Sequence, residues 1–231
     1  MVDDHGWVRK AVVDNDTFAL LRAGTARADA VAVICGSGIN CVGRRADGRV
    51  ARYPALGWET GDWGGAEMLG REALFVAARA EDGRGEPTAL VDAVRAHFGA
   101  ESVEAVGIEV HYRRLPQSRL GELAPLVAEA ADAGDPVADA LLTRVANEVA
   151  LFVRRAFGDL EVNAADVVLG GGMFQGEPGR FHERVLERLP AGAQPVVLDA
   201  PPVLGALLAA LDLAEADEAA KARVREELRA R

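Results

Sequence analysis

Apolar and polar residues alternate along the chain in two different periods. Short runs of β-branched residues closed by glycine turns indicate strands, whereas apolar positions that recur every three or four residues indicate helices. By this criterion strands are predicted at residues 11–13, 30–35, 39–43, 49–53, 167–169 and 195–198. Helices are predicted directly after residue 16, at 66–80, 90–98, 103–112, 120–133, 137–157 and 181–189, from about 203, and in the charged tail 215–231.

The order of these elements predicts the fold class. Strands dominate the front, helices the middle, and strands and helices alternate at the end, which is typical of a mixed α/β domain with a split sheet. In the tail, i,i+4 pairs such as Asp217 with Lys221 and Glu227 with Arg231 predict a solvent-exposed helix. Residues 54–65 are dense in glycine and tryptophan and are expected to form a loop with packing or ligand-binding duties.

Composition narrows the classes of function. The 231 residues are 50% hydrophobic and 27% charged, with a net charge of −10 at pH 7. This content predicts a buried core, and the acidic balance predicts no binding to nucleic acid or anionic lipid. No apolar run reaches the ~20 residues of a membrane-spanning helix and no signal peptide is recognisable, so a cytoplasmic location is expected. Cys35 and Cys41 are too few for a disulfide framework and lack the CxxC spacing of metal or redox sites.

Two glycine motifs are candidate phosphate sites. Gly36, Ser37 and Gly38 follow a strand, so backbone N–H groups and a hydroxyl can face an anion. Taken alone, the motif favours an ordinary tight hairpin turn, because glycine turns are common. Gly170, Gly171 and Gly172 also follow a strand and precede a helical segment, where α/β proteins bind ligands. This second motif matches neither GxGxxG nor the Walker A pattern, and packing glycines remain the alternative.

Carboxylates mark two further candidates. Asp16 ends a strand at the mouth of the predicted sheet and can accept the proton of a substrate hydroxyl, but Asp is also a preferred helix N-cap, and that role alone explains it. In the segment GWETGDWGG, Trp58 and Trp63 flank Asp62 among four glycines. An aromatic face beside a carboxylate acceptor suits a sugar, and core tryptophans in a bent loop are the alternative.

Five segments in order resemble a known family: VVDNDTFALLRAGT, AVAVICGSGINC, GWETGDWGG, VVLGGGMFQ and PPVLGALLAAL. They are similar to the later motifs of the BadF/BadG/BcrA/BcrD-type ATPase and N-acetylglucosamine kinase family. This family belongs to the sugar kinase, heat-shock protein and actin superfamily, whose two RNase H-like domains close on ATP. The resemblance runs from about Val13 to Leu211 and implies an α/β, RNase H-like (actin/hexokinase-like ATPase) domain.

The resemblance also implies roles for single residues. Asp16 matches the acidic residue proposed as the base for the sugar hydroxyl. The implied sugar contacts are Asn40, Asp62 and, with a shifted spacing, Trp58. The implied nucleotide contacts are Gly36, Ser37 and Gly38 in the second phosphate loop and Gly170, Gly171 and Gly172 in the adenosine motif. Pro202 and Gly205 match the hinge-like second connecting segment. ATP and Mg²⁺ are the implied cofactors, and no metal-ligating residue is identified.

The chain departs from the family pattern in three places. Trp63 stands where the kinases carry Glu in GDEG, and Trp58 lies two residues nearer to Asp62 than the Trp of their GGWG. Upstream of Val13 nothing resembles the first phosphate loop, DGGxTKT, which normally holds the Mg-linked Asp. We therefore expect an N-terminally truncated member with little kinase activity on its own. Residues 1–28 would be a remnant of the first domain, 29–202 the complete second domain, and 203–231 helices packed back on the remnant.

The function implied is ATP-dependent phosphorylation of a hexose or N-acetylhexosamine at a primary hydroxyl. Small-molecule sugar and ATP are the expected partners, and a homodimer is left open. One alternative is a BadF-type ATPase that drives electron transfer, which would need a cysteine arrangement for a shared iron–sulfur cluster that Cys35 and Cys41 do not resemble. The other alternative is a catalytically impaired fragment that binds a ligand or a partner subunit.

Overall fold

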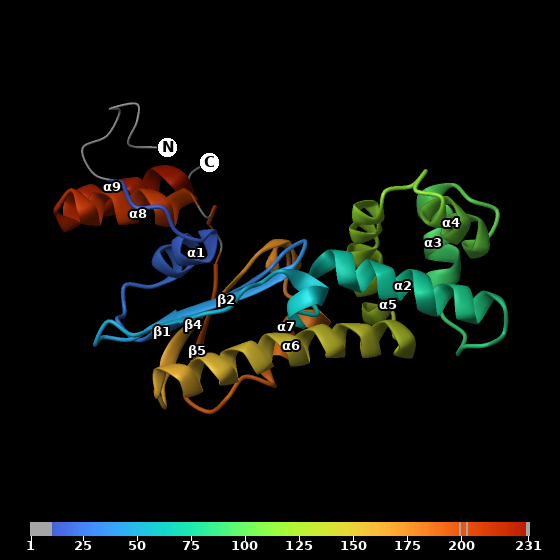
Figure 1. Ribbon diagram of the computed structural model, residues 1–231, viewed down its shortest axis with the longest axis horizontal. Coiled ribbons are helices and arrows are strands. Elements are labelled where there is room, and N and C mark those ends of the chain that lie inside the picture. The colour runs from blue at the N-terminus through green and yellow to red at the C-terminus, as the bar shows by residue number, and fades with distance from the viewer. Residues whose placement is uncertain (1–10, 199, 202, 230–231) are drawn as a thin grey trace.

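A five-stranded mixed sheet lies in the middle of the molecule (Figure 1). In the computed structural model, residues 11–198, 200–201 and 203–229 are described. The strands are β1 (Ala30–Cys35), β2 (Ile39–Arg44), β3 (Val50–Arg52), β4 (Ala165–Gly170) and β5 (Ala193–Val197), in the order β3-β2-β1-β4-β5. The first three strands form two antiparallel hairpins, whereas β4 and β5 run parallel to β1. The mixed α/β architecture predicted from the sequence is confirmed.

Helices cover both faces of this sheet. The long helix α6 (Pro136–Leu160) runs beneath it and α1 (Asp16–Gly24) lies on the opposite face (Figure 1). In β1, Val31, Val33 and Cys35 belong to the core on the α6 side, while the small residues Ala30 and Ala32 lie under α1. This alternation follows from the two-residue period of a strand.

A helical part extends one end of the molecule. It consists of α2 (Gly65–Glu81), α3 (Leu90–Phe98), α4 (Val103–His111), η3 (Gln117–Leu123) and α5 (Ala124–Asp132). Helix α2 crosses η3 at Gly70, where an added Cβ atom would lie 1.8 Å from the Leu120 carbonyl oxygen. The single helix predicted at 120–133 is divided into η3 and α5, because Pro125 lacks an N–H and is accommodated only in the first turn of a helix.

The C-terminal helices gather around α1 at the other end (Figure 1). After α7 (Arg180–Leu186), α8 (Val203–Leu213) packs on α1 at Gly205, where an added Cβ would lie 1.6 Å from the Ala19 carbonyl oxygen, and α9 (Glu218–Arg229) packs on α8. The Lys221 ammonium pairs with Asp212 and Glu218 instead of with Asp217 as predicted. The Asp217 carboxylate instead accepts a bond from the Ala220 N–H at the start of α9. Arg231 and Pro202 lie outside the described residues.

The predicted strand at residues 11–13 is wrong. These residues have no regular structure, and Val12 and Val13 are 66% and 83% exposed. Among the described residues no strand pairs with them, and a strand without a ladder partner has no hydrogen bonds to hold it.

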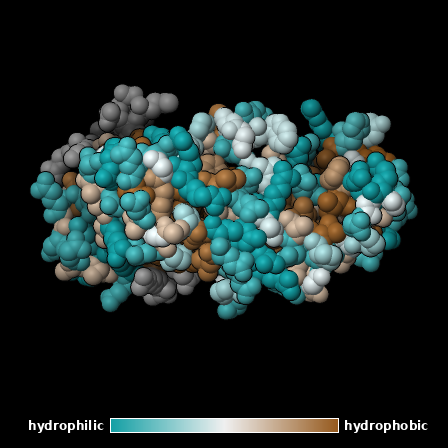
Figure 2. Space-filling view, turned by 90° about the horizontal axis from the view of Figure 1, so that it is seen from below, coloured by the Kyte–Doolittle hydropathy of each residue, from teal (hydrophilic) through white to brown (hydrophobic). Residues whose placement is uncertain are grey.

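The face seen from below is mostly hydrophilic, with small apolar patches between polar groups (Figure 2). Within the described part of the chain, no helix is both long and apolar enough to cross a membrane.

Candidate functional site

The first glycine motif is a turn held by the start of α2. It links β1 to β2, and the Gly36 N–H donates to the Gly38 carbonyl at 2.9 Å within the turn. The Ala66 and Glu67 N–H groups donate to the carbonyls of Gly36 and Ser37 at 2.7 and 3.0 Å. The first amides of α2 therefore fix this loop. Among the described residues, the Ser37 and Gly38 N–H groups and the Ser37 hydroxyl remain without a protein acceptor.

The second glycine motif lies against the first. Gly170 ends β4, and Gly171 has a φ of +96°, a conformation that favours glycine. A Cβ atom added to Gly171 would lie 2.5 Å from the Cys35 carbonyl oxygen and 2.9 Å from the Gly36 nitrogen. The structure thus brings the two glycine motifs together at the carboxyl ends of the parallel strands β1 and β4, the edge where α/β proteins bind ligands.

Asp16 lies in the first turn of α1 but is not its cap. The Asn15 side chain accepts the Thr17 N–H at 3.0 Å and is the N-cap, so the cap explanation for Asp16 is wrong. Asp16 is exposed and forms no side-chain hydrogen bond with any other described residue. The Asn40 amide of β2 donates to Asn15 Oδ1 and Thr17 Oγ1, at 3.0 Å each. Asn40 is therefore beside the helix terminus that carries Asp16.

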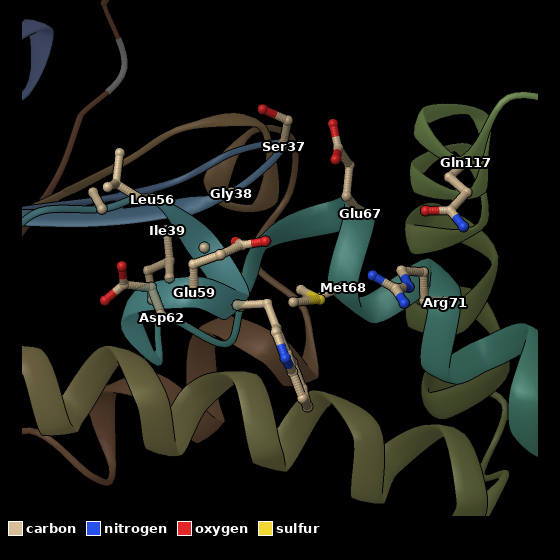
Figure 3. Close-up of a pocket in the computed structure, with 14 residues that line it drawn as sticks. Ser37, Gly38, Ile39, Leu56, Glu59, Asp62, Glu67, Met68, Arg71 and Gln117 are labelled. Atoms are coloured by element: carbon tan, nitrogen blue, oxygen red, sulfur yellow. The ribbon is translucent and has the colours of Figure 1, made fainter.

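A cavity of about 270 Å³ joins the Gly36–Gly38 turn to the tryptophan loop (Figure 3). Its lining includes Ser37, Gly38, Trp58 and Asp62. Asp62 is only 8% exposed and accepts a hydrogen bond from the Thr60 hydroxyl, whereas Trp58 is 72% exposed. The cavity places a buried carboxylate and an exposed indole beside a turn with free amides.

Trp63 does not flank Asp62 as an open aromatic face. It is 6% exposed and belongs to the core, with the Arg144 guanidinium carbon 3.8 Å from its ring centre. Arg144 also pairs with Glu72 of α2 at 3.3 Å. Of the two tryptophans, Trp58 alone is available to a ligand in the described structure, and Trp63 fastens the loop to α6.

Two further cavities adjoin the predicted residues. One of about 440 Å³ is lined by Asn15, Asn40, Val42, Arg52, Tyr53 and Pro54. Arg52 there pairs with Asp14. The other, about 780 Å³, is lined by residues 174–178, which follow Gly172 in the chain, and by 197–198, 200–201 and 228. The first lies next to the predicted sugar contact Asn40, and the second follows the predicted adenosine motif.

Sequence reasoning missed several lining residues. Arg71 and Gln117 line the 270 Å³ cavity, and Arg52 and Tyr53 line the one beside Asn40. Arg71 follows the GDWGG segment on α2, and a helical projection from that segment would have brought it to the same side as Glu67. Gln117 comes from a distant element and carries no local signal.

The cysteines are unsuited to metal or redox chemistry. Cys35 and Cys41 are buried in the sheet, and burial raises the pKa of the Cys35 thiol to about 12 and that of Cys41 further still. Both thiols therefore stay neutral at physiological pH. Since the thiolate is the form that binds metals and reacts, neither cysteine is suited to such chemistry. The described residues also contain no group of three His, Cys, Asp or Glu side chains that could hold a metal ion.

The sequence matches the family model of the BadF/BadG/BcrA/BcrD ATPase family over residues 2–210. The chain belongs to this family. The motif resemblance was expected to start at about Val13, and the family match begins further upstream, at residue 2.

Curated relatives of this family member include sugar kinases. It is 29% identical over 169 residues to the N-acetylmuramic acid/N-acetylglucosamine kinase of Clostridium acetobutylicum, covering 73% of this chain and 55% of that protein. It is 28% identical over 138 residues to the N-acetyl-D-glucosamine kinase of Dictyostelium discoideum, covering 58% of this chain and 43% of that protein. The chain thus spans about half the length of these relatives.

Solved structures of sugar kinases share the fold. A candidate N-acetylglucosamine kinase from Chromobacterium violaceum is similar with a TM-score of 0.61 and 26% identity, over 84% of this chain and 63% of that one. A ROK family glucokinase from Streptomyces griseus, solved with glucose and AMPPNP, gives a TM-score of 0.51 at 19% identity, over 87% and 67% of the two chains, and supports the fold alone. The actin/hexokinase-like ATPase fold implied by the motifs is confirmed.

Proposed function

We propose that the chain supplies the sugar-binding and nucleotide-binding residues of an ATP-dependent kinase for an N-acetylhexosamine or hexose. The observation that carries the proposal is the shared cavity in which the buried Asp62 carboxylate lies beside the Ser37–Gly38 turn. Names of the curated relatives favour an N-acetylhexosamine as the substrate.

The nucleotide would lie along the edge formed by the two glycine motifs. Phosphate oxygens would accept hydrogen bonds from the Ser37 and Gly38 amides and from the Ser37 hydroxyl, because these three groups have no acceptor among the described residues. Gly170, Gly171 and Gly172 would line the path toward the 780 Å³ cavity, which is large enough for an adenosine group.

The sugar would occupy the other side of the turn. Asp62 would accept sugar hydroxyl groups, Asn40 would hold the Asn15–Thr17 terminus of α1 and contact the sugar, and Trp58 would offer its exposed ring. Asp16 would orient the primary hydroxyl and accept its proton, since its exposed carboxylate is free to meet a substrate.

Residues of this chain fit Mg²⁺ only in part. Mg²⁺ is commonly held by one or two carboxylates together with substrate phosphates and water, and the described residues provide single carboxylates and no cluster of three. Mg²⁺ bound to ATP would neutralise charge on the transferring phosphoryl group.

We also propose a division into two units. Helices α8 and α9 would belong with α1, because α8 packs against α1, and residues 29–202 would form a separate unit around the sheet.

Calorimetric titration of the 231-residue chain with N-acetylglucosamine, glucose and Mg²⁺-AMPPNP tests the function. We expect saturable binding of the nucleotide analogue and of at least one sugar. Nucleotide binding without sugar binding would favour the family's ATPases over its kinases. A chain that binds neither ligand would overturn the proposal.

A further inference from the structure

A positively charged side chain lies in the same cavity as Asp62. Arg71 stands on the exposed side of α2 and lines the cavity together with Ser37, Met68 and Gln117. In Figure 3 its guanidinium points toward Met68 and the cavity, while Gln117 approaches from η3. Neither Arg71 nor Gln117 has a role in the site as proposed above.

Arg71 has no partner within the described part of the chain. Other arginines of the helical part do: these are Arg79 with the Arg84 carbonyl, Arg84 with Asp82, Arg95 with Asp92, Arg114 with Glu109, and Arg119 with Glu122. Arg113 shares with Arg71 the lack of any hydrogen bond or ion pair to a described residue, but Arg113 does not line the cavity. Arg71 is thus a guanidinium without a protein acceptor at a candidate binding site.

The acidic residues that line the cavity do not pair with Arg71. Glu67 lies one turn earlier on α2, but it forms no ion pair with Arg71, and in Figure 3 its carboxylate points away from the guanidinium. Asp62 and Glu59 lie toward the opposite end of the same view. Two of the three lining carboxylates therefore lie at the loop end. Arg71 and Gln117 lie at the α2–η3 end, where the third carboxylate, Glu67, is turned away from the guanidinium.

We propose that Arg71 and Gln117 form an anion subsite that binds an oxyanion of the substrate occupying this cavity. A guanidinium offers five N–H donors in a planar fork that matches a carboxylate or a phosphate, and the Gln117 amide adds two more donors. The inference rests on the proposed function and extends it, because it assigns a charged group to one of the two ligands.

Two substrate groups carry this chemistry. One is a carboxylate attached to the amino sugar, which would reach Arg71 while the sugar hydroxyl groups face Asp62. The other is a phosphate oxygen of the nucleotide, since Ser37 and Gly38 line the same cavity. The cavity, at about 270 Å³, lies near the lower end for ligand sites and suits a monosaccharide or a phosphate group better than a whole nucleotide.

Titration of Arg71→Gln, Arg71→Lys and the wild-type chain tests the subsite. The probes are N-acetylglucosamine, its 3-O-carboxyethyl ether, and Mg²⁺-AMPPNP. Arg113→Gln is the matched control, because it removes the same charge from the same helical part outside the cavity. Thermal melting of each variant checks that the fold is kept.

We expect Arg71→Gln to weaken one of the two anionic probes at least about tenfold, as for a lost charge-assisted hydrogen bond, and to leave neutral N-acetylglucosamine within about twofold. Arg71→Lys should retain part of the affinity. Loss confined to the carboxyethyl sugar assigns the subsite to a substrate carboxylate, and loss confined to AMPPNP assigns it to a phosphate.

Anionic probes that bind Arg71→Gln as well as they bind Arg113→Gln would overturn the subsite. So would an equal loss for the neutral sugar, because it would show that Arg71 acts without recognising charge. A wild-type chain that binds no sugar and no nucleotide would instead overturn the proposed function, and the subsite with it.

Discussion

The guanidinium carbon of Arg144 lies 3.8 Å from the centre of the Trp63 ring, which joins the loop of Asp62 to helix α6. Trp63 follows Asp62 directly, and the Arg144–Glu72 pair ties the same helix to α2. The position of the buried Asp62 carboxylate therefore depends on a contact between segments far apart in the sequence.

Arg144→Gln is expected to weaken sugar binding by roughly 2- to 30-fold, the range of a lost cation–π contact. Nucleotide affinity should change less, because Arg144 contacts Trp63 and Glu72 and neither glycine turn. Arg155→Gln, which removes an exposed charge from the same helix, is the control. Calorimetry with N-acetylglucosamine and AMPPNP separates the two affinities, and an equal loss of both would mean that Arg144 supports the fold as a whole.

Asp16→Asn is expected to lower phosphoryl transfer by roughly 10²- to 10⁴-fold in any form of the protein that turns over, because a general base for the sugar hydroxyl is lost. ATP binding should persist, since the proposed site places Asp16 on the sugar side, beside Asn40. A coupled assay gives the rate and titration gives the affinity. Turnover within a few-fold of wild type would leave Asp16 with no chemical role.

Gly171→Ala is expected to destabilise the fold by about 2 to 4 kcal/mol, because a Cβ atom is strained at a φ of +96° and would meet the Cys35 carbonyl at 2.5 Å. The melting temperature should fall by roughly 5 to 15 °C. Gly172→Ala controls for the substitution, since its Cβ would meet nothing within 4 Å. If both variants melt alike, the two glycine motifs do not touch as described.

Asp212 should make stability depend on pH in the acid range. The Arg22 guanidinium, followed by the Lys221 ammonium, holds the pKa of Asp212 at about 2. Because this folded-state pKa is below the ordinary value of 3.8, the stabilisation is present above about pH 4 and is lost as the pH falls toward 2.

Asp212→Asn is accordingly expected to lower the free energy of unfolding at pH 7 and to match wild type near pH 2. Denaturant titrations at the two pH values measure the difference, and Glu226→Gln, an exposed charge change on α9, is the control. A deficit that is the same at both pH values would show that the Asp212 charge is not responsible. High salt should shrink the effect, because the Asp212 side chain is 40% exposed.

Much of the fold follows from local sequence. The β-branched run before Gly36 and the Asp47–Gly48 turn predict β1 to β3, and Gly48 has the positive φ that such a turn uses. The parallel pairing of β4 with β1 cannot be predicted from the spacing of hydrophobic residues, because the whole helical part separates the two strands in the sequence. The resemblance to a known family implied the type of domain and did not specify this pairing.

Candidate residues could be named where a motif carries its own geometry. The two glycine motifs and Asp62 were candidates because glycine and a flanked carboxylate are distinctive, and the structure brings the two glycine motifs together and places Asp62 in a cavity with Ser37 and Gly38. Trp63 is buried in the core with Arg144 of α6 against its ring, and Asn40 of β2 donates to Asn15 and Thr17 beside the N-cap. Both N-cap candidates have equal local preference, so only a tertiary contact distinguishes them.

In the proposed function, the Asp62 loop binds the sugar and the two glycine motifs bind the nucleotide. The most direct test of this assignment is calorimetric titration of wild type and Asp62→Asn with N-acetylglucosamine and with Mg²⁺-AMPPNP, with Glu86→Gln as an exposed control that removes the same charge. We predict that Asp62→Asn loses at least about tenfold in sugar affinity, as for a hydrogen bond to a charged group, and keeps its AMPPNP affinity within about twofold. Unchanged sugar affinity with weakened nucleotide binding would contradict the account and exchange the roles of the two loops.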